Sequence, residues 1–265
     1  MYFKFLIGDV FRVIDNEQPK KQRKDLDWKS YWTYEQINTW MDSLVALRPG
    51  VVTHINIGKS YEQRDIRGIK VNIGGGEKKS VVFEGTIHAR EWISTATTTW
   101  MINELLTTTD PEIQELAKRY EWVVLPLTNP DGYHYTWTKD RVWRKTRQPS
   151  NLICFGADPN RNWDNHFNEA GSSTNPCNDL YAGSAPFSEP ETKHLSEYLK
   201  TVPRLAAYFS FHAYGQMMML PYGWTKDLLD NYQELYEIGA KGVAALTSKY
   251  GKKYKLGSIA NVICE

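Results

Sequence analysis

Three residues of the chain, His88, Glu91 and His212, combine metal-binding side chains with positions at or near the ends of apolar runs. His88 and Glu91 lie three positions apart in the stretch GTIHAREWIS, which follows an apolar run, and His212 ends a second apolar run. A catalytic zinc centre uses three histidine or carboxylate ligands and keeps a fourth position open. The three side chains are therefore candidate ligands of one catalytic zinc ion.

The His-x-x-Glu spacing alone is weak evidence, because short motifs recur by chance. Taken by itself, His88 is better explained as a hydrogen-bonded histidine at the end of a strand. Two further stretches, RVWRKTR and DPNRNWD, add arginines, a carboxylate and an amide. Arginine binds carboxylates through two parallel hydrogen bonds and stabilises oxyanions, although any single arginine is equally consistent with a surface ion pair. Together, the three stretches favour a metal-dependent hydrolytic site.

The segments that carry these residues alternate between helices and short apolar strands, which predicts an α/β fold with a mixed, mostly buried sheet flanked by helices. Helices are predicted over 33–45, 92–106, 111–118, 188–201 and 226–250, and strands over 51–58, 69–73, 81–83, 122–127 and 205–211. His88 and His212 both follow strands, and ligands bind beyond the carboxyl ends of strands in open sheets.

Local signals refine these boundaries. Three consecutive glycines, 74–76, predict a hairpin between the second and third strands. Residues 129–132, NPDG, predict a turn, and residues 188–191, SEPE, predict a capping box at the start of a helix. Residues 139–187 are polar and rich in Pro, Gly, Asn and Ser, and such a long irregular segment indicates that it builds a site.

The composition limits the classes of partner. The net charge is +1, with 41% hydrophobic and 24% charged residues, so neither nucleic acid nor a membrane surface is expected to bind. No apolar run is long enough to cross a membrane. Lys4 and Asp9 interrupt the N-terminal apolar residues, which argues against a signal peptide. The three cysteines allow either one disulfide with an odd thiol or three free thiols.

Five stretches together resemble the zinc metallocarboxypeptidases of the pancreatic and digestive type, the carboxypeptidase A/B family. They are GTIHAREWIS, NPDGY, RVWRKTR, DPNRNWD and FSFHAYGQMMMLPYGW. The resemblance extends from about residue 27 to residue 263. It implies a zinc carboxypeptidase fold and hydrolysis of the C-terminal peptide bond of peptides or proteins.

The same resemblance implies the roles of the residues at the reaction centre. His88, Glu91 and His212 would bind zinc. Asp158 would accept a hydrogen bond from His88 and fix its tautomer. Arg144 would face the scissile carbonyl and stabilise the oxyanion.

Further residues would bind the substrate. Asn160 and Arg161 would hold its free C-terminal carboxylate, and Arg90, Arg141 and Tyr214 would line its path. Met219 and Gly223 align with the side-chain pocket, where glycine favours an apolar or aromatic C-terminal residue, as in the A-type enzymes.

The resemblance also implies where the protein acts and how it is activated. Cys154 and Cys177 would form a disulfide, which indicates an extracellular, secreted protein. Residues 1–26 would be a remnant of a propeptide and its activation linker, with a basic cluster at 20–24 for a trypsin-like activating protease. Residues 27–265 would form the catalytic domain, and a monomer is expected.

At the C-terminus the family pattern is not followed. Cys264 stands where the family has a mobile lid tyrosine, and the family's general-base glutamate, final strand and closing helix would lie beyond Glu265. We therefore expect an incomplete version of an ordinary enzyme. The alternatives are a non-catalytic relative that binds zinc and peptide carboxylates, and a zinc deacylase of related fold, against which the Asn160 and Arg161 pair argues.

Overall fold

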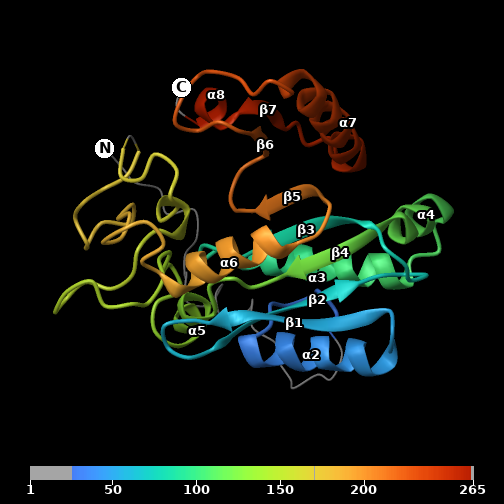
Figure 1. Ribbon diagram of the computed structural model, residues 1–265, viewed down its shortest axis with the longest axis horizontal. Helices are drawn as coiled ribbons and strands as arrows, with labels where there is room; N and C mark the ends of the chain where they lie inside the picture. The colour runs from blue at the N-terminus through green and yellow to red at the C-terminus, as the bar shows by residue number, and fades with distance from the viewer. Residues whose placement is uncertain (1–25, 170, 264–265) are drawn as a thin grey trace, which may run out of the picture. The chain divides into compact units, whose positions relative to one another are not determined.

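The computed structural model describes residues 26–169 and 171–263 (Figure 1). The basic cluster at 20–24, Cys264 and Glu265 lie outside the described residues. Contacts group the described residues into two compact units, one made of 26–167 and 173–213 and the other of 168, 169, 171, 172 and 214–263. The division at residue 26 stays a prediction.

The first unit contains the elements that position the predicted zinc ligands. They are α2 (Tyr34–Leu47), β1 (Val52–Lys59), β2 (Asp65–Val71), β3 (Lys79–Gly85), α3 (Trp92–Thr107), α4 (Pro111–Arg119), β4 (Tyr120–Leu125), α5 (Pro130–Thr138), a 3-10 turn (Pro159–Arg161), α6 (Pro190–Thr201) and β5 (Leu205–Phe211). The predicted α/β class with a mixed sheet is confirmed. Within the described part of residues 139–187, the structure has the 3-10 turn but no other helix and no strand of either sheet, so this segment is irregular as predicted.

The five strands of this unit are ordered β1-β2-β4-β3-β5. β1 and β2 are antiparallel neighbours, β2 and β4 are antiparallel, and β3 is parallel to both β4 and β5. The predicted hairpin between β2 and β3 is therefore wrong. The three glycines do adopt positive φ, as a turn requires, but β4 lies between the two strands that they connect.

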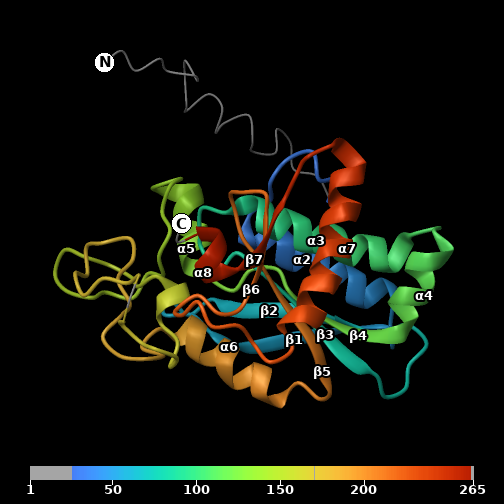
Figure 2. The same cartoon turned by 90° about the horizontal axis from the view of Figure 1, so that it is seen from above.

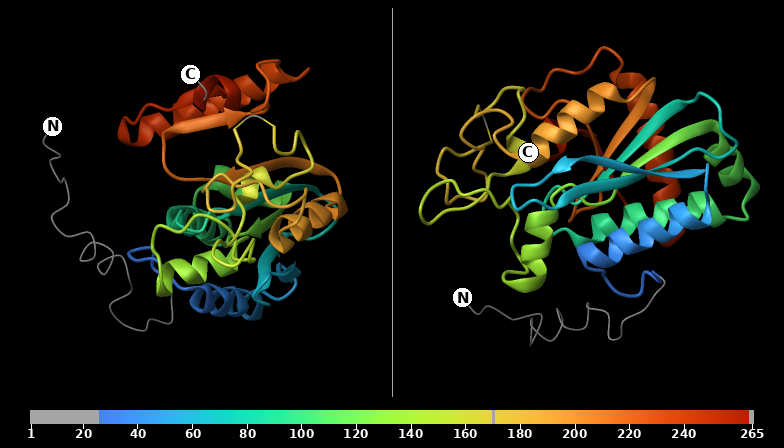
Figure 3. Two further views of the ribbon diagram at one scale, coloured as in Figure 1. Left: turned by 90° about the vertical axis from the view of Figure 1, so that its left-hand side faces the viewer. Right: turned by 60° about the horizontal axis from the view of Figure 1, so that its bottom comes forward.

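Helices cover both faces of the central strands of this sheet (Figures 1 and 3), whereas most side chains of β5 are exposed. On one face, Val81 and Trp122 pack with side chains of α2 and α3, including Met41 and Ile102. On the other face, the alternate positions of β3 and β4 pack against Leu195 of α6, and Figure 2 shows α6 alongside β1. Successive side chains of a strand point to opposite faces, so the two apolar layers hold the central strands rigidly.

Two helix starts differ from prediction for the same physical reason. The NPDG stretch begins α5 instead of a turn: Pro130 occupies the first helical position and the Asn129 side chain accepts a hydrogen bond from the Gly132 N–H. At α6, Pro190 is likewise first, so Glu189 is the N-cap and the predicted capping box does not form. Proline favours the first helical turn because its fixed φ suits the helix and no N–H is needed there.

The second unit holds β6 (Met217–Leu220), α7 (Tyr232–Tyr250), β7 (Lys255–Ser258) and α8 (Ile259–Ile263), with β6 and β7 parallel. α7 begins at Tyr232, later than the predicted residue 226, and ends at Gly251 with a φ of 68° as predicted. Of the helices in the described part of the chain, none is both long and apolar enough to cross a membrane.

Candidate metal centre

The register of β3 and β5 brings the two predicted histidine ligands together. Gly85 at the end of β3 pairs with Phe211 at the end of β5, and the strands are parallel. His212 follows Phe211 directly, and His88 lies in the turn that follows Gly85. The sheet therefore presents both imidazoles beyond the carboxyl ends of neighbouring strands, as predicted.

The turn from β3 to α3 is held by hydroxyl groups. Thr86 has a φ of 52°, which is rare for a β-branched residue. Its N–H donates to Ser94 Oγ at 3.0 Å, and its hydroxyl lies 2.8 Å from the same atom. Glu91 is the N-cap of α3 but makes no side-chain cap bond. Its carboxylate is instead directed at the two histidines.

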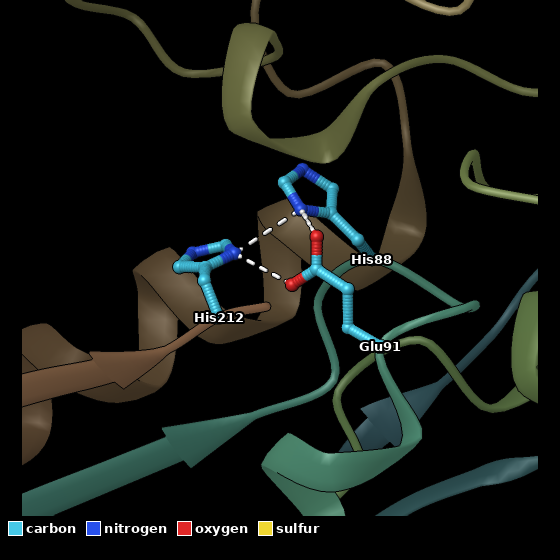
Figure 4. A group of neighbouring side chains, drawn as sticks. All are labelled: His88, Glu91 and His212. Carbon is cyan, nitrogen blue, oxygen red and sulfur yellow. Dashed lines mark hydrogen bonds and ion pairs between the residues drawn. The ribbon is translucent and has the colours of Figure 1, made fainter. Parts of the chain in front are cut away.

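His88, Glu91 and His212 form a compact donor cluster (Figure 4). His88 Nδ1 lies 2.9 Å from Glu91 Oε1, His212 Nδ1 lies 3.0 Å from Glu91 Oε2, and the two Nδ1 atoms are 3.1 Å apart. His88 and Glu91 are buried, whereas the His212 side chain is 26% exposed. One side of the cluster is therefore closed and another is accessible.

The donor set fits a zinc ion. His88 Nε2 lies 3.0 Å from Asp158 Oδ1, and a carboxylate can only accept, so in the neutral imidazole the proton lies on Nε2 and Nδ1 carries a lone pair. Two imidazole nitrogens and a carboxylate, each able to donate a lone pair, converge with 2.9–3.1 Å between them, an arrangement that a cation stabilises. Zinc–ligand bonds of about 2.0–2.1 Å in a tetrahedron place the donors about 3.3 Å apart, close to the separations seen here.

Asp158 joins this cluster to Arg144. It is fully buried, and besides His88 it accepts hydrogen bonds from Arg144 Nη2 at 2.8 Å and from the Asn160 N–H at 2.9 Å. Burial opposes ionisation of this carboxyl, but the His88 and Arg144 partners outweigh it and hold the pKa of Asp158 well below its usual range. Arg144 also approaches the ligands, with Nη1 3.7 Å from Glu91 Oε1.

Asn129 connects the two loops that carry these residues. Its side-chain amide donates to the carbonyls of Ile87 and Lys145, each at 3.1 Å, and it is completely buried. The Ala89 N–H adds a bond to the Arg144 carbonyl at 3.0 Å. The NPDGY stretch therefore has a physical role in positioning His88 and Arg144.

Two further predicted site residues, Arg90 and Arg141, lie in the same loops. Arg90 Nη1 donates to the Val142 carbonyl at 3.3 Å and lies 3.4 Å from Asp179. The Arg141 guanidinium stacks on the Trp92 ring at 3.7 Å and donates to the Arg90 carbonyl. Arg141 therefore also supports the segment that carries Arg90.

The predicted carboxylate-binding residues lie on the 3-10 turn of the first unit. Asn160 is directed at the cluster, with Nδ2 3.3 Å from His212 Nε2, and Arg161 Nη1 contacts the Asn160 carbonyl at 3.4 Å. Tyr214 belongs to the second unit, where its side chain is fully solvent-exposed. Cys154 and Cys177 form a disulfide, as the resemblance implies.

Two residues beside the cluster were not predicted. Glu84 is a buried carboxylate within the apolar strand β3, and Ser210 on β5 lies between Glu84 and His212. A charged residue inside a run that is otherwise apolar was the signal that could have identified Glu84.

Residues 37–265 match the Peptidase M14 family, described as zinc carboxypeptidase. The chain belongs to this family. It is 42% identical over 260 residues to zinc carboxypeptidase A 1 of Anopheles gambiae, which covers 96% of this chain and 60% of that relative. It is 41% identical to carboxypeptidase B of Astacus astacus, covering 90% of this chain and 79% of the relative.

Among solved structures, carboxypeptidase A from Helicoverpa armigera superposes with a TM-score of 0.88 at 28% identity. That similarity covers 98% of this chain and 67% of the other. Relatives of both A and B types are therefore found, and the chain spans about 60% of the length of the Anopheles protein.

Proposed function

We propose that the protein is a zinc-dependent carboxypeptidase that removes C-terminal residues from peptides or proteins. The observation that carries this proposal is the cluster of His88, Glu91 and His212 with the Arg144 guanidinium beside it. His88, Glu91 and His212 would hold one zinc ion. When bound, zinc supplies Lewis acidity and an activated water molecule near neutral pH.

Arg144 is the residue proposed to stabilise the developing oxyanion. Two of its nitrogens bond Asp158, at 3.2 and 2.8 Å, so the guanidinium is held before substrate arrives. A preorganised donor costs no reorganisation during the reaction, and loss of one such donor typically lowers kcat by about 10²–10³-fold. The resemblance places a general-base glutamate C-terminal to Ile263, and no described residue is proposed for that role.

Asn160 and Arg161 are proposed to bind the terminal carboxylate of the substrate, which would make the enzyme an exopeptidase. Both lie in the 3-10 turn that begins after Asp158, whose carboxylate also accepts the Asn160 N–H. The residue that holds His88 therefore also supports the proposed carboxylate site. Arg90, Arg141 and Tyr214 are proposed to contact the substrate further out.

The proposed preference is for apolar or aromatic C-terminal residues. It rests on the alignment of Met219 and Gly223 with the family pocket. A β-carbon added at Gly223 would lie 3.0 Å from Ile259 Cγ2, so this position favours glycine on packing grounds also. We further propose a secreted monomer, activated by a trypsin-like protease, on the basis of the resemblance and the disulfide.

The test is release of the last residue from peptides ending in Phe or in Lys by the full-length protein isolated from its source, measured by mass spectrometry with zinc and after chelation. We expect zinc-dependent release, faster from the Phe peptide. Arg144→Lys should lower kcat with little change in KM, because it keeps the charge but loses the bidentate geometry. Arg204→Lys, a surface change, is the control.

Zinc binding without release of any residue would contradict the proposal and support the non-catalytic relative. Release of acyl groups from N-acylated amino acids, with intact peptides left uncut, would support the deacylase alternative.

A further inference from the structure

Glu84 is a buried carboxylate to which the proposed reaction assigns no role. It lies on β3 directly opposite Ser210 on β5 in the parallel pairing, and its side chain has no exposed surface. Thr128 Oγ1 donates to Glu84 Oε1 at 2.6 Å, the Ser210 hydroxyl bonds Oε2, and the Tyr208 hydroxyl lies 3.4 Å from Oε2. Hydroxyl donors on both oxygens suit a carboxylate rather than a carboxylic acid.

Ser210 connects this carboxylate to the metal centre. Ser210 Oγ lies 3.1 Å from His212 Nε2, the ring nitrogen on the far side from Glu91 and His88. A single hydroxyl therefore lies between a buried charge and one of the proposed zinc ligands.

The hydrogen-bond inventory determines where the protons lie. The hydroxyl proton of Ser210 is donated to Glu84, because a carboxylate can only accept. The Ser210 oxygen then faces His212 with a lone pair, so His212 Nε2 must carry the proton of the imidazole. His212 Nδ1 is left with a lone pair directed at His88 Nδ1 and Glu91 Oε2, where a metal ion would bind.

One contact favours the opposite tautomer. The Asn160 amide nitrogen lies 3.3 Å from His212 Nε2, and two donors cannot share that position. The Ser210 contact is shorter and is backed by the charge of Glu84, and charge-assisted hydrogen bonds are about twice as strong as neutral ones. Rotation of the Asn160 amide would place its oxygen at this nitrogen instead.

We propose that Glu84 and Ser210 are positioning residues that fix the tautomer of His212 for metal binding. This inference rests on the proposed zinc-dependent function. His88 is fixed directly by Asp158, whereas His212 is fixed by Glu84 through one hydroxyl. Each imidazole of the cluster thus has a carboxylate behind it, one in direct contact and one relayed.

The test compares four variants of the full chain. Ser210→Ala removes the relay, Glu84→Gln removes its charge, and Ser210→Thr restores the hydroxyl. Thr128→Val is the matched control, because it removes a hydrogen bond to Glu84 without touching the relay. Zinc affinity is measured by competition with a chelator. The tautomer of His212 is measured in the metal-free protein by long-range proton–nitrogen NMR at mildly alkaline pH.

We expect Ser210→Ala to weaken zinc binding by about 10-fold, at the low end for an outer partner of a metal ligand. Glu84→Gln should have a smaller effect in the same direction, since its amide oxygen still accepts from Ser210. Ser210→Thr and Thr128→Val should bind zinc as the wild type does. The wild type should show the proton on His212 Nε2, and Ser210→Ala should show a mixture of tautomers.

Equal zinc affinity in Ser210→Ala and Thr128→Val would overturn the inference, as would a proton on His212 Nδ1 in the wild type. A wild-type protein that binds no zinc would overturn both this inference and the proposed function. Zinc binding that depends on Ser210, without hydrolysis of any peptide, would overturn only the proposed function.

Discussion

The metal centre and the start of α6 both bury carboxyl groups, with opposite consequences for ionisation. At the candidate metal centre, burial raises the pKa of Glu91, but hydrogen bonds with His212 and His88 in their protonated form outweigh it and lower the pKa to about 2. With neutral rings, whose Nδ1 atoms carry lone pairs, a bound cation would favour the ionised carboxylate in the same way. At α6, burial of Glu191 is not offset, and the nearby Asp131 and Glu189 carboxyls add to it, so the pKa of Glu191 rises to about 8.

The difference lies in the partners. Glu191 is 2% exposed and accepts one long hydrogen bond, from the Tyr61 N–H at 3.4 Å. Its second oxygen has no hydrogen-bond partner within the part of the chain that the structure describes. Burial by itself disfavours a charged carboxyl, and positively charged neighbours or hydrogen-bond donors to the carboxylate reverse that effect. Glu91 therefore stays ionised beside the two histidines, whereas Glu191 is protonated where it packs at the start of α6.

The largest expected effect comes from removing the carboxylate that bridges both histidines. Glu91→Ala should abolish measurable zinc binding and peptide hydrolysis. The loss should exceed the 10–100-fold typical of an outer partner, because a ligand itself is removed. Zinc content after dialysis measures it, with Glu112→Ala on the exposed face of α4 as control. Retained zinc in Glu91→Ala would assign the metal to other residues.

Asp158→Asn should have the next largest effect. The substitution leaves Arg144 without its buried counter-charge and weakens the anchor of His88. Breaking such a pair costs about 3–5 kcal/mol of stability, and zinc affinity should fall by about 10–100-fold. Urea denaturation and chelator competition measure the two effects, with the exposed Asp164→Asn as control. A smaller loss of zinc affinity in Asp158→Asn than in Ser210→Ala would contradict the expectation that the direct contact of Asp158 with His88 matters more than the indirect contact of Glu84 with His212.

Glu191→Gln should change the pH dependence of stability. The folded state keeps the Glu191 proton up to about pH 8, whereas the unfolded state loses it near pH 4.3. Stability from this group is thus complete below the unfolded pKa and is lost as pH rises, at up to about 1.4 kcal/mol per unit. Urea denaturation across that window should show a steeper fall for the wild type than for Glu191→Gln.

Glu197→Gln, on the exposed side of the same helix, should retain the wild-type slope. Identical slopes for the wild type and Glu191→Gln would show that Glu191 is ionised in the folded state, and the contrast between the two regions would then fail.

The smallest expected effect belongs to an exposed carboxylate. A hydrogen bond from Lys59 at 2.9 Å, with a second from Asn56, lowers the pKa of Asp65. The stability that the ionised Asp65 contributes is present above its pKa in the unfolded chain and is lost as pH falls through its folded pKa. Solvent screens this interaction, so the contribution is small. Asp65→Asn should cost less than about 1 kcal/mol near neutral pH, measured by urea denaturation. If Asp65→Asn cost as much stability as Asp158→Asn, burial would not be the reason why the Asp158 interactions are strong.

Much of the fold followed from local signals in the chain. The helix after Thr33, the helix after Glu91 and the strand that ends at Phe211 all occur where apolar periodicity and caps predicted them. The pairing of the strands could not be predicted in the same way. The three glycines after β2 indicate a turn, but they do not indicate that β4 rather than β3 pairs with β2. The helix starts at Pro130 and Pro190 were predicted wrongly, because the residue types that favour turns also favour the first positions of a helix.

The sequence by itself determined the donor set, since His88, Glu91 and His212 follow apolar strands and lie in stretches that together resemble the zinc carboxypeptidases. The tertiary structure decided which donors support them. The resemblance already implied Asp158 as the partner of His88, but Glu84 is distant in sequence from His212, and only the parallel register of β3 and β5 places Glu84 opposite Ser210. Local sequence fixes backbone preferences over a few residues, whereas the proton on an imidazole depends on contacts between strands that are far apart in the chain.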